Sequence, residues 1–317
     1  MIKGTLFGLL ACFIWGLIFV IPGFIEEFSS IEVVFGRYFF YGLLSLVFFI
    51  SKGKRYPLSL WKRALGYSLV ASIIYYLSLV LALRFATPPI AAIILGLAPI
   101  PITLYGNWKE KKCDYLQLAL PCLLLLVGLV MVNAPHFINS PTPLLFTFGL
   151  INGFISFATW SWYAVTNAEF LKQNPHVRSE EWSTLMGIAN LIWVVLFILP
   201  VAFFYSDTPL VTKYFLFSPS IKKFILGSMA LGFVCSWVGG FYWNKASRIL
   251  PISLSGQLLI FETVFGLLFV YSLEGAFPSL LETSGIILLL AAVSYGVHLT
   301  SRGKAKAPEV QENVSQS

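Results

Sequence analysis

The residue with the clearest chemical potential in this chain is an acid inside an apolar segment. Glu262 lies in the stretch GQLLIFETVFG (256–266). At 1.5 Å per residue, a helix that begins near Pro251 would place Glu262 roughly 17 Å deep, close to the middle of a bilayer. A carboxylate at that depth costs about 2.5–3.5 kcal/mol on insertion scales. We therefore expect Glu262 to face the interior of a helical bundle or a wet cavity.

Several roles are open for Glu262. Burial favours the protonated form of a carboxyl group, which would suit a proton carrier, unless a cation pairs with it. The group could instead receive the ammonium of a ligand, or could form a structural bond between helices. Arg37, near the start of an apolar segment, is the candidate cation; it could equally bind an anionic ligand group or extend to the membrane interface. Gln257 is a candidate hydrogen-bond partner for a ligand.

A polar stripe and several aromatic residues complete the candidate site. Asn152, Ser156, Thr159 and Tyr163 recur at helical spacing and share one face, which either lines a cavity or joins helices by hydrogen bonds. Trp and Tyr usually mark interfaces, but those far from segment ends could stack a ligand or contact a cation. The predicted substrate-binding or coupling residues are Glu262, Gln257, Arg37, Trp15, Tyr75, Asn152, Thr159, Trp160, Tyr163 and Trp237.

Metal, nucleotide and covalent chemistry are not indicated. The four cysteines and three histidines show no metal-ligand spacing, and the sequence has no phosphate-binding loop or GxSxG elbow. We expect no metal, no cofactor and no enzymatic activity. An intramembrane lipid-modifying enzyme is the alternative, but it needs acids or histidines converging at one membrane face. A structural membrane subunit that transports nothing is the third hypothesis.

The elements that must position these residues are membrane-spanning helices. Of the 317 residues, 58% are hydrophobic and 11% are charged, whereas soluble domains have about 45–50% and about 25%. Apolar runs of roughly 20 residues match a hydrocarbon core of about 30 Å. The sequence predicts an all-α polytopic membrane protein with ten spans, at residues 4–25, 31–51, 63–84, 87–107, 115–134, 143–166, 182–205, 223–244, 251–272 and 280–300.

The basic residues predict the orientation. With ten spans, most of the 21 Lys and Arg residues lie on the side of the N-terminus, so the positive-inside rule places both termini in the cytoplasm. The location expected is the cell inner membrane. Because the net charge of +7 follows the membrane sides, it does not indicate binding to nucleic acid.

Weak internal repeats divide the chain into two halves. The matching pairs, in the same order in each half, are Gly8 and Gly153, Trp15 and Trp160, Ala82 and Ala246, Arg84 and Arg248, and Glu110 and Glu274. We expect five spans in residues 1–139, five in 140–301, and a disordered cytoplasmic tail at 302–317. Because five is odd, the second half is inverted, an arrangement typical of secondary transporters.

With these features the chain resembles the EamA family of the drug/metabolite transporter superfamily. The likeness rests on the paired Gly and Trp residues, on Arg37, on ALRFATPPIAAIILGLAP (82–99), and on Glu110 with Glu274. The stretches WYAVTN (162–167) and LGF (231–233) are similar to bacterial aromatic amino-acid exporters. The resemblance covers essentially all ten spans, and it implies a 5+5 inverted repeat around a central cavity with alternating access. Glu262 departs from the family, which usually has a proline there, the counterpart of Pro99.

The sequence therefore predicts a secondary active transporter, most simply an exporter of small metabolites such as amino acids. Glu262 is the candidate for proton coupling. The expected partners are a small-molecule substrate and the lipid bilayer, with the protein a monomer or a weak homodimer.

Overall fold

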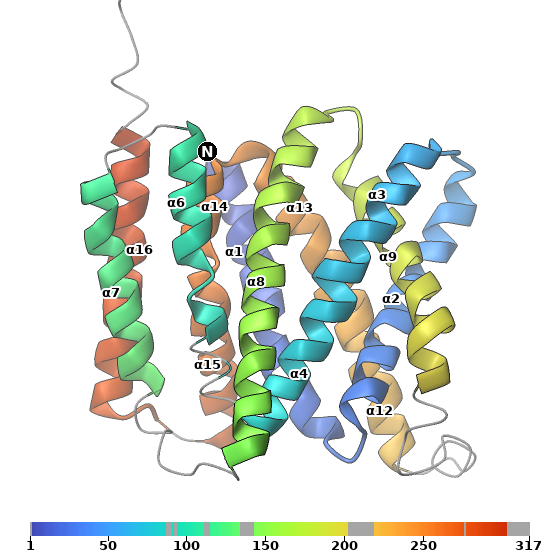
Figure 1. The fold of residues 1–317 in the computed structure, drawn as a ribbon, viewed down its shortest axis with the longest axis horizontal. Coiled ribbons are helices and arrows are strands. Elements are labelled where there is room, and N and C mark those ends of the chain that lie inside the picture. Colours follow the sequence, from blue (N-terminus) through green and yellow to red (C-terminus); the bar gives the residue numbers. More distant parts are fainter. Residues whose placement is uncertain are drawn as a thin grey trace, which may run out of the picture.

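The structure is a computed structural model, and it describes residues 2–86, 91, 94–110, 115–133, 143–201, 219–275 and 277–302. All regular structure in these residues is helical (Figure 1). In the first part of the chain the helices are α1 (Ile2–Gly16), η1 (Leu17–Phe19), η2 (Ile21–Ile25), α2 (Ser30–Lys52), α3 (Leu58–Ser68), η3 (Leu69–Ile74), α4 (Tyr75–Phe85), α6 (Pro99–Glu110) and α7 (Tyr115–Asn133). In the second part they are α8 (Pro143–Gln173), α9 (Ser179–Trp193), η5 (Val194–Ile198), α12 (Pro219–Met229), η6 (Ala230–Val238), α13 (Gly239–Ile249), α14 (Ile252–Leu258), α15 (Ile260–Glu274) and α16 (Leu280–Arg302).

These helices include the membrane spans. Among the described residues, seven helical stretches are long and apolar enough to cross a membrane, and shorter apolar helices cover Leu116–Val132 and Leu280–Gly296. Each of the expected spans contains at least one described helix, although only α6 represents the expected span at 87–107. The predicted boundary between the halves, at residues 139 and 140, and all but the first residue of the predicted tail lie outside the described residues.

Local signals in the sequence set several helix ends. Ser29 and Glu32 form a capping box that begins α2, and the Ser29 hydroxyl accepts from the Glu32 backbone N–H. Gly53 and Gly275, which follow α2 and α15, have φ angles of 57° and 62°. Only glycine adopts this left-handed conformation without strain, so both helices end there.

Glycines occur in reciprocal pairs where long helices cross. Gly42 of α2 lies against Leu191 of α9, while Gly187 of α9 lies against Ser45 of α2. A Cβ atom on Gly42 would meet the Leu191 Cβ at 2.4 Å, so any larger residue would push the helices apart. The pair thus fixes a close approach, as small residues do between helices in membranes.

The same reciprocity joins α7 to α16. Gly128 of α7 lies against Leu289 of α16, and Gly285 of α16 lies against Val132 of α7. These two helices stand side by side at one edge of the bundle (Figure 1).

The glycines of the first and sixth spans also make matching contacts. Gly8 of α1 lies against Leu258 and Ala246, and Gly153 of α8 lies in the same way against Ile94 and Ala82. The first span therefore packs on helices late in the chain, and the start of the sixth packs on helices early in the chain.

Several spans are irregular near their middle. The third and eighth of the expected spans contain the π-helical segments η3 and η6, and π-helical segments are often found at functional sites. The ninth is interrupted at Leu259, where the Glu262 backbone N–H bonds the Leu259 carbonyl at 3.0 Å. The continuous helix expected from Pro251 onward is therefore two helices, and Glu262 lies in the first turn of the second.

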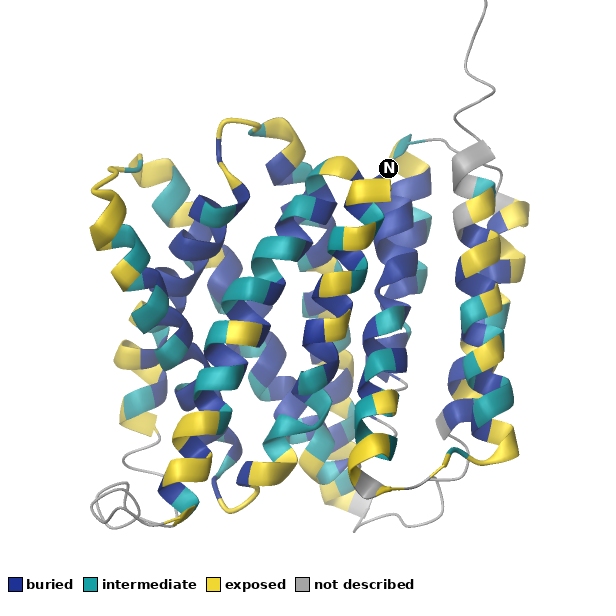
Figure 2. Cartoon of the chain, turned by 180° about the vertical axis from the view of Figure 1, so that it is seen from behind, coloured by how far each residue is buried: buried dark blue, intermediate teal, exposed yellow. Residues whose placement is uncertain are grey.

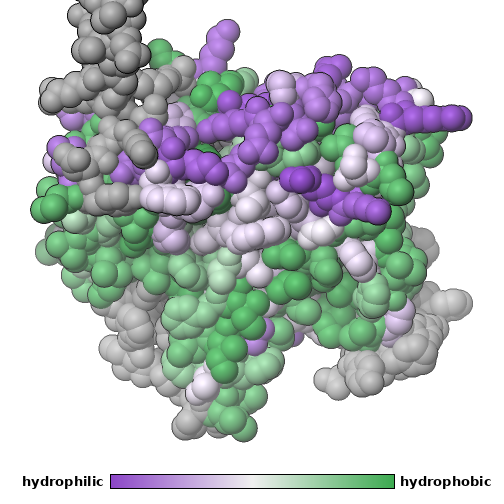
Figure 3. Space-filling model, turned by 45° about the horizontal axis from the view of Figure 1, so that its top comes forward, coloured by the Kyte–Doolittle hydropathy of each residue, from purple (hydrophilic) through white to green (hydrophobic). Residues whose placement is uncertain are grey.

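The two ends of the bundle differ in polarity. Hydrophilic side chains gather over the end that carries the N-terminus, and the flanks are hydrophobic (Figure 3). At that end Lys52 pairs with Glu180 at 2.8 Å, and Lys109 pairs with Glu169 at 2.9 Å. Buried residues concentrate inside the bundle, and exposed ones lie at its ends and outer surface (Figure 2).

Candidate functional site

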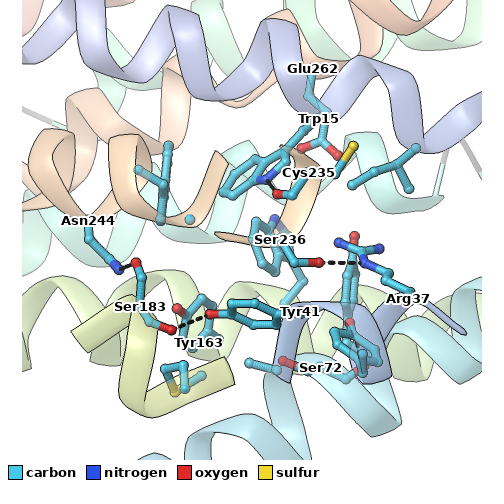
Figure 4. Close-up of a pocket in the computed structure, with 18 residues that line it drawn as sticks. Trp15, Arg37, Tyr41, Ser72, Tyr163, Ser183, Cys235, Ser236, Asn244 and Glu262 are labelled. Atoms are coloured by element: carbon cyan, nitrogen blue, oxygen red, sulfur yellow. Dashed lines mark hydrogen bonds between the residues drawn. The ribbon is translucent and has the colours of Figure 1, made fainter. Parts of the chain in front are cut away.

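A cavity of about 60 Å³ lies in the middle of the bundle. Its walls come from α1, η1, α2, η3, α4, α8, α9, η6, α13 and α15 (Figure 4). A volume of this size has room for only a few water molecules, so the walls of the cavity lie close together in this conformation. Six of the predicted site residues line the cavity: Trp15, Arg37, Tyr75, Trp160, Tyr163 and Glu262.

The other four predicted residues lie elsewhere. Gln257 is 2% exposed and lies against Gly296 of α16. Asn152 and Thr159 donate to carbonyls of their own helix, at Phe148 and Ile155. Trp237 stacks on Phe241 and Phe48.

Arg37 and Glu262 are the only formally charged residues among the described ones that line the cavity. They come from α2 and α15, and they do not form an ion pair with each other in this conformation. The sequence left open whether they pair; here they lie apart on walls of the same space (Figure 4).

The Arg37 guanidinium is held in place by neutral neighbours. Its Nε donates to the Ser236 hydroxyl at 2.9 Å. Its Cζ lies 4.1 Å from the centroid of the Tyr76 ring and 5.3 Å from that of Tyr38, which is cation–π distance. Arg37 is 5% exposed, and its Nη1 is buried with no hydrogen-bond partner.

The Glu262 carboxyl group has no polar partner within the described part of the chain, where it accepts no hydrogen bond and joins no salt bridge. The residue is 7% exposed. It also borders a second, smaller cavity beside Gly96 and Pro99, next to the turn that precedes α6. An acidic residue in the first turn of a helix is favoured by the helix dipole.

Aromatic rings form much of the wall. The Trp15 indole donates to the Cys235 carbonyl at 2.8 Å. Trp160 meets Trp15 edge to face at 5.2 Å and stacks on Tyr75 at 5.0 Å. Trp243, only 1% exposed, packs against Trp15 at 5.4 Å. These ring contacts hold the side chains in place, and the rings give this part of the cavity wall an apolar surface.

A chain of buried hydrogen bonds, here called the polar layer, lies between the cavity and the charged end. The Asn244 amide donates to the Ser183 hydroxyl and accepts from the Asn167 amide, both at 3.0 Å. The Trp182 indole donates to Asn167 at 2.8 Å, and the Tyr41 hydroxyl donates to the Ser183 carbonyl at 2.7 Å. The layer joins α2, α8, α9 and α13, and so holds the cavity walls together at this end.

The sequence missed several residues that line the cavity, among them Tyr38, Tyr41, Ser72, Ser183, Cys235, Ser236, Trp243 and Asn244. A signal for some of them existed. At the spacing that relates Ala82 to Ala246, Ser72 corresponds to Ser236; at the spacing that relates Gly8 to Gly153, Tyr41 corresponds to Met186. Extending the repeat register to every span would have pointed to these positions.

No cluster of three or more His, Cys, Asp or Glu side chains that could hold a metal ion occurs in the described residues. The cavity therefore offers ionic, hydrogen-bonding and aromatic contacts to a ligand. Those contacts suit reversible binding of a small amphipathic molecule.

The comparisons with known proteins agree with one another on the family. The model of the EamA-like transporter family matches residues 2–134. Inner membrane protein YtfF from Escherichia coli (strain K12) is 32% identical over 328 aligned positions, which cover 100% of both chains. A shorter match of 51 residues, 39% identical, covers 16% of this chain and 30% of an uncharacterized transporter from Haemophilus influenzae.

The fold has also been seen experimentally. A crystal structure with 18% sequence identity covers 94% of this chain and 98% of its own, with a TM-score of 0.74. Together with the apolar helices, these matches confirm a transmembrane protein and point to a transporter rather than an enzyme. The chain belongs to the EamA-like transporter family, within the drug/metabolite transporter superfamily.

Proposed function

We propose that this protein is a secondary active transporter that moves small metabolites, such as amino acids, across the inner membrane by alternating access. One observation carries the proposal. Walls from both parts of the chain place in a central cavity a carboxyl group without a polar partner among the described residues and a guanidinium whose Nη1 likewise has none. Transporters bind substrate near the membrane midplane, where two repeats meet.

The proposal includes a 5+5 inverted repeat. Supporting it are the reciprocal glycines of α2 and α9 and of α7 and α16, and the matched contacts of Gly8 and Gly153. In the cavity, Trp15 and Trp160 occupy corresponding positions, as do Ser72 and Ser236. The π-helical segments η3 and η6 overlap in the same register. Contacts that recur between corresponding helices of the two halves favour two copies of one five-helix unit.

In this proposal the repeats rock about the cavity. The polar layer and the surface ion pairs hold the cavity closed at the end that carries the N-terminus, which the excess of Lys and Arg places in the cytoplasm. The breaks at Leu259 and before Pro99 lie beside Glu262, and discontinuous helices of this kind commonly form transporter binding sites. Export requires this end to open, load and close again.

Glu262 is the proposed coupling residue. A buried carboxyl group that lacks a partner among the described residues can hold a proton and can release it when water reaches the site. The charged and titratable side chains that line the cavity with Glu262 are Arg37, Tyr38 and Tyr41 from α2, Tyr75 from α4, Tyr163 from α8 and Cys235 from η6. Of these, only Arg37 opposes protonation of Glu262, because it is the cation.

The test is flux in proteoliposomes loaded with a mixture of isotopically labelled amino acids, with efflux measured by mass spectrometry at several pH gradients. We expect at least one component to leave faster than from protein-free liposomes, and Glu262→Gln to lose the dependence on the gradient. Glu26→Gln, which changes an exposed carboxylate outside the cavity, is the matched control. Efflux equal to protein-free liposomes contradicts transport, and an unchanged pH dependence in Glu262→Gln contradicts coupling.

A further inference from the structure

We infer that the cavity recognises a zwitterion, with the ligand carboxylate on Arg37 and the ligand ammonium on Glu262. The inference rests on the proposed transport function, and it names the substrate class that the same cavity would select. It starts from two groups of opposite charge that line one cavity without pairing with each other.

The charge balance of the cavity selects a zwitterion. When a ligand ammonium binds, Glu262 releases the proton that it holds in the empty cavity. With Arg37 protonated and Glu262 ionised, the described lining residues then sum to zero formal charge. A ligand with a single charge would satisfy one of the two groups and leave the other buried without a counter-charge, which is costly in an apolar medium. A zwitterion satisfies both and adds no net charge to the closed cavity.

The setting of Arg37 suits a carboxylate. Ser236 and the Tyr76 ring fix the guanidinium at Nε and across its plane, while Nη1 is buried without a partner. A planar guanidinium with an unpaired edge binds a carboxylate through paired, charge-assisted hydrogen bonds. The orientation is fixed before the ligand arrives, so little side-chain entropy is lost on binding.

The setting of Glu262 suits an ammonium group. Its carboxyl lacks hydrogen bonds from the described part of the chain, and Trp15, Tyr75 and Trp160 line the same cavity. Aromatic faces attract cations, so a ligand ammonium would gain from the rings as well as from the carboxylate. The same rings would pack on the apolar body of the ligand.

A purely proton-coupled carrier of uncharged compounds would use this site differently. Glu262 would suffice for coupling, and a buried guanidinium with an unpaired Nη1 would carry only a desolvation cost. At the spacing that relates Arg84 to Arg248, Glu262 corresponds to Ala98, one residue before Pro99. Neither Ala98 nor Trp182, which corresponds to Arg37 in the other half, is charged. The two charged residues therefore lie at positions where the halves differ in sequence. They make one wall of the cavity positive and another negative.

The test uses probes that share one apolar body and differ in charge. L-phenylalanine carries both charges, 2-phenylethylamine lacks the carboxylate, and 3-phenylpropionate lacks the ammonium. L-alanine, ethylamine and propionate form the smaller series, in case the closed walls exclude an aromatic ring. Binding to the purified full-length protein is measured by ligand-dependent thermal stabilisation, which reports Kd through mass action.

We expect the zwitterion of at least one series to bind about tenfold or more tightly than either of its singly charged analogues, since hydrogen bonds to charged groups are the stronger ones. Arg37→Gln should weaken the zwitterion about tenfold or more and leave the amine unchanged. Glu262→Gln should weaken the zwitterion and the amine and leave the carboxylate unchanged. Arg55→Gln and Glu26→Gln, both exposed, are the controls.

If Arg37→Gln does not fold, Arg37→Lys keeps the charge and removes the paired geometry, and should weaken the zwitterion without affecting the amine. Equal affinity for all three probes of both series, or variants that weaken every probe alike, overturns the inference. Flux without this charge dependence overturns the inference and leaves transport standing. Charge-dependent binding without flux upholds the recognition and overturns transport.

Discussion

The polar layer gives the sharpest prediction about how the cavity opens. Asn244→Ala removes the acceptor for the Asn167 amide and the donor to the Ser183 hydroxyl, two bonds of 3.0 Å each. Asn167 and Ser183 are 0% and 1% exposed, so water does not replace the lost bonds while the layer stays closed. Each buried group left without a partner costs about 1–3 kcal/mol.

Two such groups together cost the closed conformation about 2–6 kcal/mol relative to one in which the layer is open to water. At about 1.4 kcal/mol per tenfold, the ratio of closed to open molecules falls roughly 30- to 20,000-fold. Cys235 reports this change, because it lines the cavity and is 0% exposed. In a variant whose other cysteines are serine, a charged thiol reagent added on the side of the N-terminus should modify Cys235 at least about 30-fold faster.

The matched control is Asn174→Ala, whose amide donates to the Phe170 carbonyl of its own helix end and takes no part in the layer. The explanation fails if Asn244→Ala and Asn174→Ala leave Cys235 equally protected. It also fails if Asn244→Ala accelerates modification only from the opposite side of the membrane, because the layer would then not be the closure at the N-terminal end.

Two further predictions concern stability. Gly187→Ala should destabilise the fold by about 1–3 kcal/mol through overpacking, because its Cβ would meet the Ser45 hydroxyl and the Tyr41 ring; its melting temperature in detergent should therefore fall. Gly66 has open space around it, so Gly66→Ala should keep the original melting temperature. Equal melting temperatures for the two variants would contradict the close approach of α2 and α9. Glu110→Gln should also destabilise the fold by about 1–3 kcal/mol and so lower the melting temperature. The Glu110 carboxylate accepts from the Ile252 N–H at 2.8 Å and from the Ser253 hydroxyl at 3.2 Å, at the start of α14. A melting temperature equal to that of Glu26→Gln would show that this cap does not stabilise the fold.

The sequence was most informative where a residue type was unusual for its surroundings. Arg37 and Glu262 are conspicuous in apolar segments, and the repeated tryptophans marked Trp15 and Trp160; all four line the cavity. Ser72 and Ser236, which lie in the π-helical segments η3 and η6, were not found, because serines are common in apolar helices.

Other features were hidden for different physical reasons. Asn244 and Ser183 lie near the ends of predicted spans, where polar residues are ordinary, so nothing distinguished them from surface groups. The break at Leu259 has no proline or glycine at its own position. Gln257 was predicted because it is polar in an apolar segment. Its place beside Gly296 depends on how α14 packs against α16, which no local pattern encodes.

The packing of the first span has a consequence for how the protein is made. Cys12 of α1 donates to the Leu258 carbonyl, a partner 246 residues later in the chain. At a synthesis rate of about 5–20 residues per second, the first helix waits roughly 12–50 s for this neighbour. During that time its glycine face has no native surface to pack on and must be covered by lipid or by the insertion machinery. Assembly is therefore completed only after the last helices emerge from the ribosome, and chains truncated before α14 should be substrates for membrane quality control.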